Sequence, residues 1–309
     1  MNLWRSVPCL DVDLDEFKSS DIDNEDKDWD DFEDFAAMVM FRCDMALLDS
    51  FRLHVTTSKA PDCGDRQAGG WLRHAMKYNS SPNPRSKREG WSSKNNSWNL
   101  KKPCLCNVFL DDRFAEHVRS VCRSLQDVEL DGCRCKVHAI TSHSMKKLVL
   151  KNCRWSNLAQ IASPTLETLA IDGGWNSHGC QLVILTPAVA YLHLAVDADR
   201  FPGGISINGT MPSLVKASIH LQCHRYSAFK SKLHRRQLKL LRSVSNVVNL
   251  ELSGVGTKVI DKNLTLFQEF RNLRNLLLEE CDLSDNTLGS FLQNSPPNLE
   301  MLTLRHCKI

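Results

Sequence analysis

Apolar residues recur along the chain in one spacing, L-x-x-L-x-L or a close variant of it, in nine copies. The last two apolar residues of each copy alternate with variable ones, which is typical of a short strand with one buried face. Four copies also carry a cysteine three residues after the last apolar position. These four are Leu125-Val128-Leu130-Cys133, Met145-Leu148-Leu150-Cys153, Leu273-Leu276-Leu278-Cys281 and Leu299-Leu302-Leu304-Cys307. The other five are Leu100-Pro103-Leu105, Leu166-Leu169-Ile171, Val189-Leu192-Leu194, Leu214-Ala217-Ile219 and Val247-Leu250-Leu252.

The copies begin 20 to 33 residues apart, and this period is typical of leucine-rich repeats. Because a single repeat cannot bury its own apolar face, neighbouring copies have to stack on one another. The pattern therefore predicts an α/β fold, a right-handed leucine-rich-repeat solenoid or horseshoe whose parallel sheet lines the concave face. Its strands are expected over residues 127–131, 147–151, 168–172, 191–195, 216–220, 249–253, 275–279 and 301–305.

The repeat domain is expected to cover residues 35–309. An earlier copy, Leu48-Phe51-Leu53, begins two periods of 26 residues before Leu100, so one repeat between them has lost its signal. Residues 79–98 contain no leucine, isoleucine or valine and cannot form a buried strand. This stretch is either a surface loop outside the solenoid or the result of a local change of coding frame. Pro103, at a strand position, indicates some degradation of the pattern here.

Carboxylates are concentrated near the amino terminus, where residues 11–34 hold thirteen of them and two lysines. A stretch this acidic and this poor in apolar residues is expected to stay solvated and mobile. Its end is expected to be helical, because apolar residues between Phe32 and Met40 recur at helical spacing.

Whole-chain properties exclude several classes of protein. The 309 residues carry a net charge of +3 and include no run of 18 apolar residues, so no membrane-spanning helix is expected. The amino terminus lacks the apolar core and cleavage site of a secretory signal, and we expect an intracellular protein of the cytoplasm or nucleus. In that compartment the thirteen cysteines are expected to be reduced, and those of the repeats to act as small buried residues.

Metal and catalytic motifs are weak in this sequence. Potential zinc ligands cluster in two places, Cys133, Cys135, His138 and His143, and the pair Cys104 and Cys106. Cys-x-Cys is not the usual zinc spacing, and Cys133 already has a place in its repeat, so we interpret these cysteines as structural. An EF-hand-like stretch from Asp21 lacks the glycine and the glutamate that calcium binding requires. Because catalytic motifs are missing too, we expect no enzymatic activity, no metal site and no cofactor.

A basic segment, residues 230–242, lies within the longest interval between copies. Its lysines and arginines are interspersed with leucines, which predicts an amphipathic helix packed on the outer face of the solenoid. Nucleic-acid binding would favour aromatic residues among the basic ones, and only Tyr226 and Phe229 lie nearby. We therefore favour a solvated basic helix and expect no nucleic-acid partner, with docking to an acidic protein surface as the alternative.

The outward positions of the strands form one continuous surface in a parallel solenoid. On the middle and later strands they carry aromatic, acidic and basic side chains together, which suits a protein partner better than a polyanion. We expect a partner protein to bind this concave face. The candidate binding residues are Tyr191, His193, Lys216, His220, Glu251 and Glu279.

Several stretches resemble plant F-box/leucine-rich-repeat proteins, and together they span almost the whole chain. The segment from Leu3 to Asp13 resembles the one that directly follows the F-box in that family. The other similar stretches are residues 29–53, 109–114, 140–143, 212–217 and 250–254. In that family the F-box docks onto the Skp adaptor of a cullin-RING ubiquitin ligase, and the repeats hold the protein to be ubiquitinated. The resemblance implies that residues 1–10 are a remnant that follows an F-box.

The chain departs from this family at both ends. The F-box that is expected upstream of Trp4 is missing, and no capping segment follows Cys307. We therefore expect the chain as given not to bind the Skp adaptor, which would require an upstream F-box. Two functions stay open: a non-enzymatic protein-binding module resembling the substrate-recognition part of a ligase adaptor, and a free-standing leucine-rich scaffold or decayed copy unconnected with ubiquitin.

Overall fold

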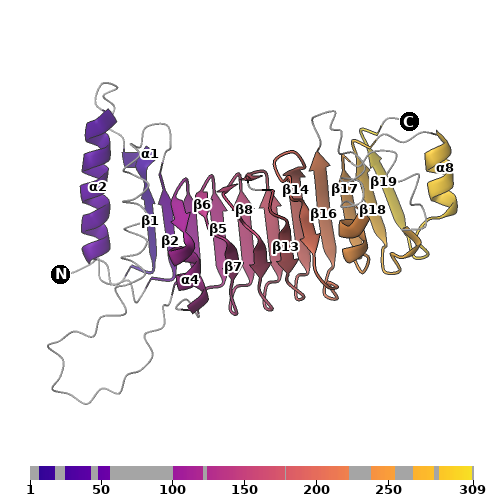
Figure 1. Cartoon of the computed structure of the whole chain (residues 1–309), viewed down its shortest axis with the longest axis horizontal. Coiled ribbons are helices and arrows are strands. Elements are labelled where there is room, and N and C mark those ends of the chain that lie inside the picture. The colour runs from indigo at the N-terminus through magenta and orange to yellow at the C-terminus, as the bar shows by residue number, and fades with distance from the viewer. Residues whose placement is uncertain are drawn as a thin grey trace, which may run out of the picture.

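The computed structural model describes residues 7–17, 25–42, 48–55, 100–120, 124–177, 179–222, 238–254, 267–281 and 285–307. Eleven parallel strands run side by side in chain order along the molecule (Figure 1). They are β1 (Cys9–Asp13), β2 (Ser50–His54), β3 (Lys102–Cys106), β5 (Asp127–Asp131), β8 (Lys147–Lys151), β11 (Thr168–Asp172), β14 (Tyr191–Asp197), β16 (Lys216–Gln222), β17 (Asn249–Ser253), β18 (Asn275–Glu279) and β19 (Met301–Arg305). Helices include α1 (Leu14–Phe17), α2 (Glu25–Arg42), α4 (Asp112–Ser120) and α8 (Asp285–Gln293).

The predicted α/β class with one large parallel sheet is confirmed, and so are the eight predicted strands. Six strands have the expected bounds, and β14 and β16 extend two residues further. Equivalent positions of successive copies pair directly, so that Leu148 lies opposite Val128 on one side and Leu169 on the other. Leu148 and Leu276 are each only 1 % exposed, as the inward register predicts. Stacking of these apolar rows buries surface that a single copy would leave in water.

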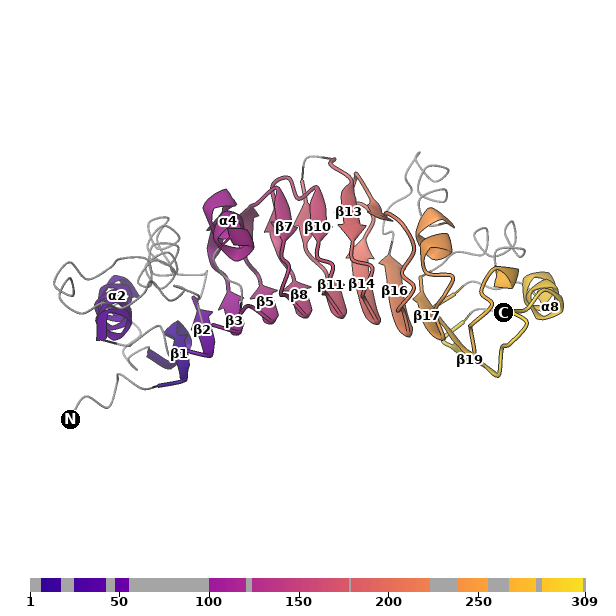
Figure 2. The ribbon, with the colours of Figure 1, turned by 90° about the horizontal axis from the view of Figure 1, so that it is seen from below.

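The outer wall of the solenoid changes along the chain. In the middle it consists of two small parallel sheets of short strands. One contains β4 (Phe109–Asp111), β6 (Arg134–Lys136), β9 (Arg154–Trp155) and β12 (Trp175–Asn176), and the other β7 (Ala139–Thr141), β10 (Gln160–Ala162), β13 (Leu182–Leu185) and β15 (Ile205–Ile207). Towards the ends, α4, the helical residues 238–243 and α8 take the place of these strands. Figure 2 shows the large sheet on the concave side of a gentle curve.

Most inner strands end in a corner whose first residue has a left-handed backbone. These corner residues are Asn107, Gly132, Asn152, Gly173, Gly254, Glu280 and His306, with φ between 49° and 69°. Glycine and asparagine adopt this conformation at the lowest energy, which explains their frequency there. The corner amides also bond from coil to coil, as where the Gly132 N–H donates to the Lys151 carbonyl at 2.9 Å.

The cysteine after the corner has a structural role in the repeat. The buried Cys133 thiol donates to the Leu105 carbonyl at 3.2 Å, and the Cys153 thiol donates to the Leu130 carbonyl at 3.4 Å. The same contact joins Cys281 to Leu252 and Cys307 to Leu278. Each thiol therefore satisfies a backbone carbonyl of the preceding coil, which a purely apolar side chain could not do. All nine cysteines that the structure describes are free thiols.

The amino-terminal prediction needs correction, because residues 11–34 are not a mobile segment throughout and the sheet begins well before residue 35. β1 pairs with β2 as the first strand of the sheet, and its Leu10 and Val12 are buried. These two alternating residues supply an inner face, while Asp11 and Asp13, which alternate with them, point outward. The predicted helical end is confirmed by α2, whose Phe32 is fully buried and meets the Phe17 ring at 5.7 Å.

Three smaller expectations have different outcomes. Residues 79–98 and 230–237 lie outside the described residues, so the predictions made for them stay open. Residues 238–243 are helical with Leu240 and Leu241 buried, as predicted for the end of the basic segment. Pro103 is buried within β3, which pairs with β2 along its whole length but with β5 only from Cys104 onward, so the expected degradation is limited to one side of this strand. In the described part of the chain, no helix has both the length and the apolar character that a membrane span requires.

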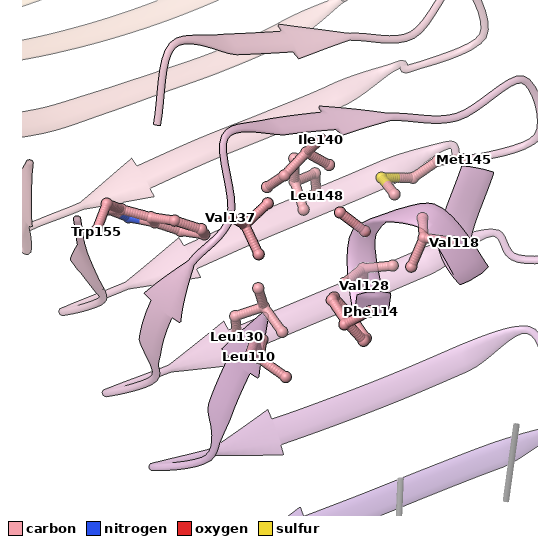
Figure 3. Close-up of a pocket in the computed structure, with 11 residues that line it drawn as sticks. Leu110, Phe114, Val118, Val128, Leu130, Val137, Ile140, Met145, Leu148 and Trp155 are labelled. Atoms are coloured by element: carbon pink, nitrogen blue, oxygen red, sulfur yellow. The ribbon is translucent and has the colours of Figure 1, made fainter. Parts of the chain in front are cut away.

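A small apolar cavity lies in the core beneath α4 (Figure 3). Leu110 and Phe114 from the outer wall meet Val128 and Leu148 from the large sheet around it. Apolar cavities without polar partners stay dry and do not hold polar ligands. This cavity therefore belongs to the packing of the core and is not a candidate binding site.

Candidate functional site

The outward side chains of the middle and later strands form three rows across the concave face, because equivalent positions are in register. The first row is Tyr191, Lys216, Asn249, Asn275 and Met301. The second is His193, Ser218, Glu251, Leu277 and Thr303. The third is Ala195, His220, Ser253, Glu279 and Arg305.

A shallow groove crosses β16 to β19 on this face. Leu277 and Met301 give it an apolar part, and the Met301 side chain is 55 % exposed. Lys216, Glu251 and Arg305 line the same groove and bring charges of both signs. An apolar centre with charged residues around it is the usual composition of a protein-binding patch.

Two histidines from neighbouring strands lie beside the groove. The rings of His193 on β14 and His220 on β16 have centroids 5.5 Å apart. The Ser218 hydroxyl lies 2.7 Å from His220 Nε2, and a Glu251 carboxylate oxygen lies 3.7 Å from the same nitrogen. Burial, and after it the neighbouring His220, lowers the pKa of His193, so that this imidazole is neutral at physiological pH.

The cluster of Ser218, His220 and Glu251 does not have the geometry of a catalytic triad. In a triad the imidazole contacts the nucleophile through one ring nitrogen and the orienting carboxylate through the other. Here both Ser218 and Glu251 approach Nε2. Ser218 is moreover only 7 % exposed, so its hydroxyl is poorly placed to attack a substrate.

The structure brings most of the predicted binding residues together. Five of the six lie on three adjacent strands, namely Tyr191, His193, Lys216, His220 and Glu251. Glu279 is more distant, because Ser253 on β17 separates it from His220 in the third row. Tyr191 is 54 % exposed and is the register neighbour of Lys216, at the edge of the groove.

Reasoning from the sequence missed three residues of the groove, Leu277, Met301 and Arg305. All three occupy outward positions on the last two strands, away from the aromatic and charged residues of the middle strands. The available signal was an apolar side chain at a position that is polar in most copies. Leu277 and Met301 both satisfy this criterion.

Carboxylates and one imidazole gather at the carboxyl ends of β1 and β2. Asp13, Asp15 and His54 are the only three metal-type ligands in the described part of the chain whose donor atoms all lie within 4.8 Å of one another. His54 Nδ1 is 3.0 Å from an Asp13 oxygen and 3.9 Å from an Asp15 oxygen. Arg52 also contacts Asp13 at 3.6 Å and Asp11 at 3.1 Å, so these carboxylates already have a cationic partner.

Two thiols lie beside this group on β3. Cys104 and Cys106 are partly exposed and lie on the same side of the strand. The interaction between the two thiols, with the nearby charges of Arg52 and Lys151, lowers the pKa of Cys104 to about 7. The same interaction raises the pKa of Cys106.

The other cluster of potential zinc ligands does not converge. Cys133 and Cys135 are buried in the core, whereas His138 and His143 are exposed. Burial raises the pKa of the Cys135 thiol, and the neighbouring Cys153 thiol together with burial raises that of Cys133. Their burial supports the structural interpretation of these two cysteines.

Comparison with known proteins does not assign the chain to a family. No protein-family model matches it, and a search of the curated proteins finds no match.

Proposed function

We propose that the chain is a non-enzymatic protein-binding module whose concave face holds a partner protein. The observation that carries the proposal is the groove across β16 to β19, which adjoins the histidine pair and Tyr191. Its apolar part is supplied by Leu277 and Met301, and charged residues of both signs surround it. A protein surface offers complementary groups for all of these, whereas a polyanion would leave Glu251 facing like charge.

Exposed large side chains on this face make suitable anchors for a partner. Tyr191 and Met301 expose 54 % and 55 % of their surface, although the strands that carry them are otherwise regular. Aromatic residues and methionine are enriched in protein interfaces, and tyrosine is among the residues that contribute most on truncation. We expect a few such residues to supply most of the binding free energy.

The resemblance to plant F-box/leucine-rich-repeat proteins gives this proposal its biological form. The chain would be the substrate-recognition part of a ubiquitin-ligase adaptor, acting in the cytoplasm or nucleus. Contact with the Skp adaptor would then belong to an F-box on a longer product. The second candidate function is a free-standing leucine-rich scaffold unconnected with ubiquitin. An in-frame F-box in the genomic sequence upstream of Met1 would favour the first function, and stop codons there would favour the second.

The test begins with proximity labelling or a two-hybrid search for a partner. The affinity of the purified partner is then measured for the chain and for a variant with Tyr191→Ala, Lys216→Ala and Glu251→Ala. We expect the triple replacement to weaken binding by at least about 2 kcal/mol, or roughly thirtyfold, because it removes an anchor and two charged contacts.

A matched control comes from the outer wall. Trp175 is 54 % exposed, like Tyr191, and its register neighbour Arg154 is also exposed. Replacing both with alanine removes similar groups from the opposite side of the coil and should leave affinity unchanged. Equal affinity of the chain and the concave-face triple variant would refute the assignment of the binding site to this face.

A further inference from the structure

The thiol pair on β3 lies among groups that a protein-binding face does not require. Cys104 and Cys106 alternate with the buried Pro103 and Leu105, so both thiols are on the concave side. Residues two apart on a strand lie on the same face, so the two thiols are neighbours there. Two thiols on one side of a strand can serve as a pair of ligands for a metal ion.

A histidine stands next to these thiols on the neighbouring strand. The register of the sheet pairs Cys106 with His54 on β2, and pairs His54 in turn with Asp13 on β1. His54 Nδ1 lies 3.0 Å from an Asp13 carboxylate oxygen. With Nδ1 held by the carboxylate, Nε2 is the ring nitrogen left to bind a ligand. Histidines that bind metals usually donate their other ring N–H to a carboxylate in this way.

We propose that Cys104, Cys106 and His54 form a zinc(II) site on the concave face, with Asp13 orienting the imidazole. Among biological cations, zinc is the one that favours a set of two sulfur donors and one nitrogen donor. The fourth position of a tetrahedral ion is left to Asp131, the register neighbour of Cys106 on β5, or to water. The sequence indicated Cys104 and Cys106 as potential zinc ligands, but their unusual spacing favoured a structural role and the imidazole comes from a distant copy.

Strand geometry favours chelation over a disulfide between the two cysteines. Residues two apart on a strand are separated by about 6.4–6.8 Å, at the upper limit of the Cα–Cα distances that disulfides allow. Two thiolates on a tetrahedral zinc, each with a bond of about 2.3 Å, need sulfurs only about 3.8 Å apart and no approach of the backbone. An extended strand therefore accommodates the ion with less distortion than the covalent bond.

The donor atoms of Cys104, Cys106 and His54 lie further apart than a bound ion would hold them. Within the described residues, only the group of Asp13, Asp15 and His54 has three donor atoms that all lie within 4.8 Å of one another. Closing the proposed site requires the two cysteine side chains to rotate towards His54. The carboxylate group is the competing site, and the experiment has to separate the two.

The experiment is a titration of the reduced, full-length chain with cobalt(II), followed by displacement with zinc(II). Absorption bands from charge transfer between thiolate and cobalt report sulfur ligation directly. We expect these bands to saturate at a single ion per chain. The double replacement Cys104→Ser and Cys106→Ser should abolish them, and His54→Gln should weaken binding at least about tenfold. Asp13→Asn should weaken it by about 10- to 100-fold while the bands persist, because the carboxylate acts through the imidazole.

Cys180→Ser is the matched control, because Cys180 is another partly exposed thiol outside the large sheet. This variant should bind cobalt(II) like the parent chain, and circular dichroism should show that all variants keep the fold. The proposal is overturned if the parent chain gives no thiolate bands. It is equally overturned if the double serine variant keeps its affinity and Asp15→Asn loses it, since the ion then sits on the carboxylate group.

Discussion

The central coils and the carboxyl-terminal coils share one inner sheet but close on the outside in different ways. Between β5 and β15 the chain returns through short strands, and copies begin 20 to 25 residues apart. After β16 the described return segments include the helical residues 238–243 and α8, and copies begin 26 to 33 residues apart. Helices thus accompany the longer intervals in this region, although α4 fits into an interval of 25 residues. Repeat length alone therefore does not decide the outer element, while the apolar register maintains the inner sheet.

The corners of the two regions differ as well. Central corners use Asn107, Gly132, Asn152 and Gly173, whereas the last two corners place Glu280 and His306 in the left-handed region. Non-glycine residues other than asparagine adopt that conformation at a cost of about 1–2 kcal/mol. The carboxyl-terminal coils therefore carry backbone strain that the central coils avoid, and we expect them to be less stable.

The largest effect is expected from cavities in the inner core of each region. Leu148→Ala and Leu276→Ala should each lower the free energy of unfolding by about 2–5 kcal/mol, because both side chains are fully buried. The loss for Leu148→Ala should lie at the upper end of this range. The outer wall of the coil that contains Leu148 consists of hydrogen-bonded strands, which collapse into a cavity less readily than the helices of the outer wall near Leu276. Urea unfolding followed by circular dichroism measures both. A larger loss for Leu276→Ala would contradict the assumed rigidity of the central wall.

A buried amide makes the next largest difference between the regions. Asn176 is 1 % exposed, and its side chain bonds both the N–H and the carbonyl of Leu158, at 3.1 and 2.8 Å. Asn176→Ala leaves both groups buried without a partner, which should cost about 1–3 kcal/mol. Asn275→Ala is the control, because its partly buried bond to Asn249 can be replaced by water. A comparable loss for the control would show that burial does not set the cost.

Glycine at a central corner can be tested by adding a methyl group. Gly132 has φ +61°, and a Cβ there would lie 2.1 Å from Asn107 Oδ1. Gly132→Ala should lower the free energy of unfolding by about 1–2 kcal/mol from the backbone conformation alone. Combining it with Asn107→Gly removes the clash and leaves only the backbone cost. If the double variant is no more stable than Gly132→Ala, the side chain of Asn107 does not contribute to the effect.

The converse substitution should stabilise the carboxyl-terminal coils. Glu280→Gly relieves a left-handed glutamate at φ 51°, and we expect a gain of about 0.5–1 kcal/mol after the greater freedom of glycine in the unfolded chain is counted. The urea midpoint should rise. Glu279→Gly, at the neighbouring position within β18, should instead lower it, because glycine weakens a strand.

The smallest effect concerns pH at the junction of the two regions, where β14 meets β16. The pKa of His193 is lowered by burial and by His220, with Lys216 opposing protonation as well and Asp172 and Glu251 favouring it. The unfolded chain therefore binds this proton more readily, and stability should fall as pH drops below about 6.5. His193→Gln should make the urea midpoint less dependent on pH between about 5 and 7. An unchanged pH dependence would exclude His193 as its source.

The inner sheet was predictable because each of its strands is specified by its own local alternation of apolar residues. The first strand, β1, was not predicted although Leu10 and Val12 give the same alternation, because the surrounding aspartates suggested a solvated chain. The outer strands lack such a pattern, since β9 and β12 are too short to show one. On the concave face, the residues of each strand were predictable from the sequence. Contacts such as that between Ser218 and His220 depend on rotamers that only the assembled sheet defines.

The hydrogen bonds from the repeat cysteines to the preceding coil have a consequence for how the protein comes apart. Cys133, Cys153 and Cys281 are buried in three different coils, so each thiol meets an alkylating reagent only when its own coil opens. Pulse labelling with such a reagent, followed by mass spectrometry, would give the time at which each coil opens. Earlier labelling of Cys281 than of Cys153 would locate the start of fraying at the helix-walled end. The cysteines that join the coils thus also report the order in which the coils separate.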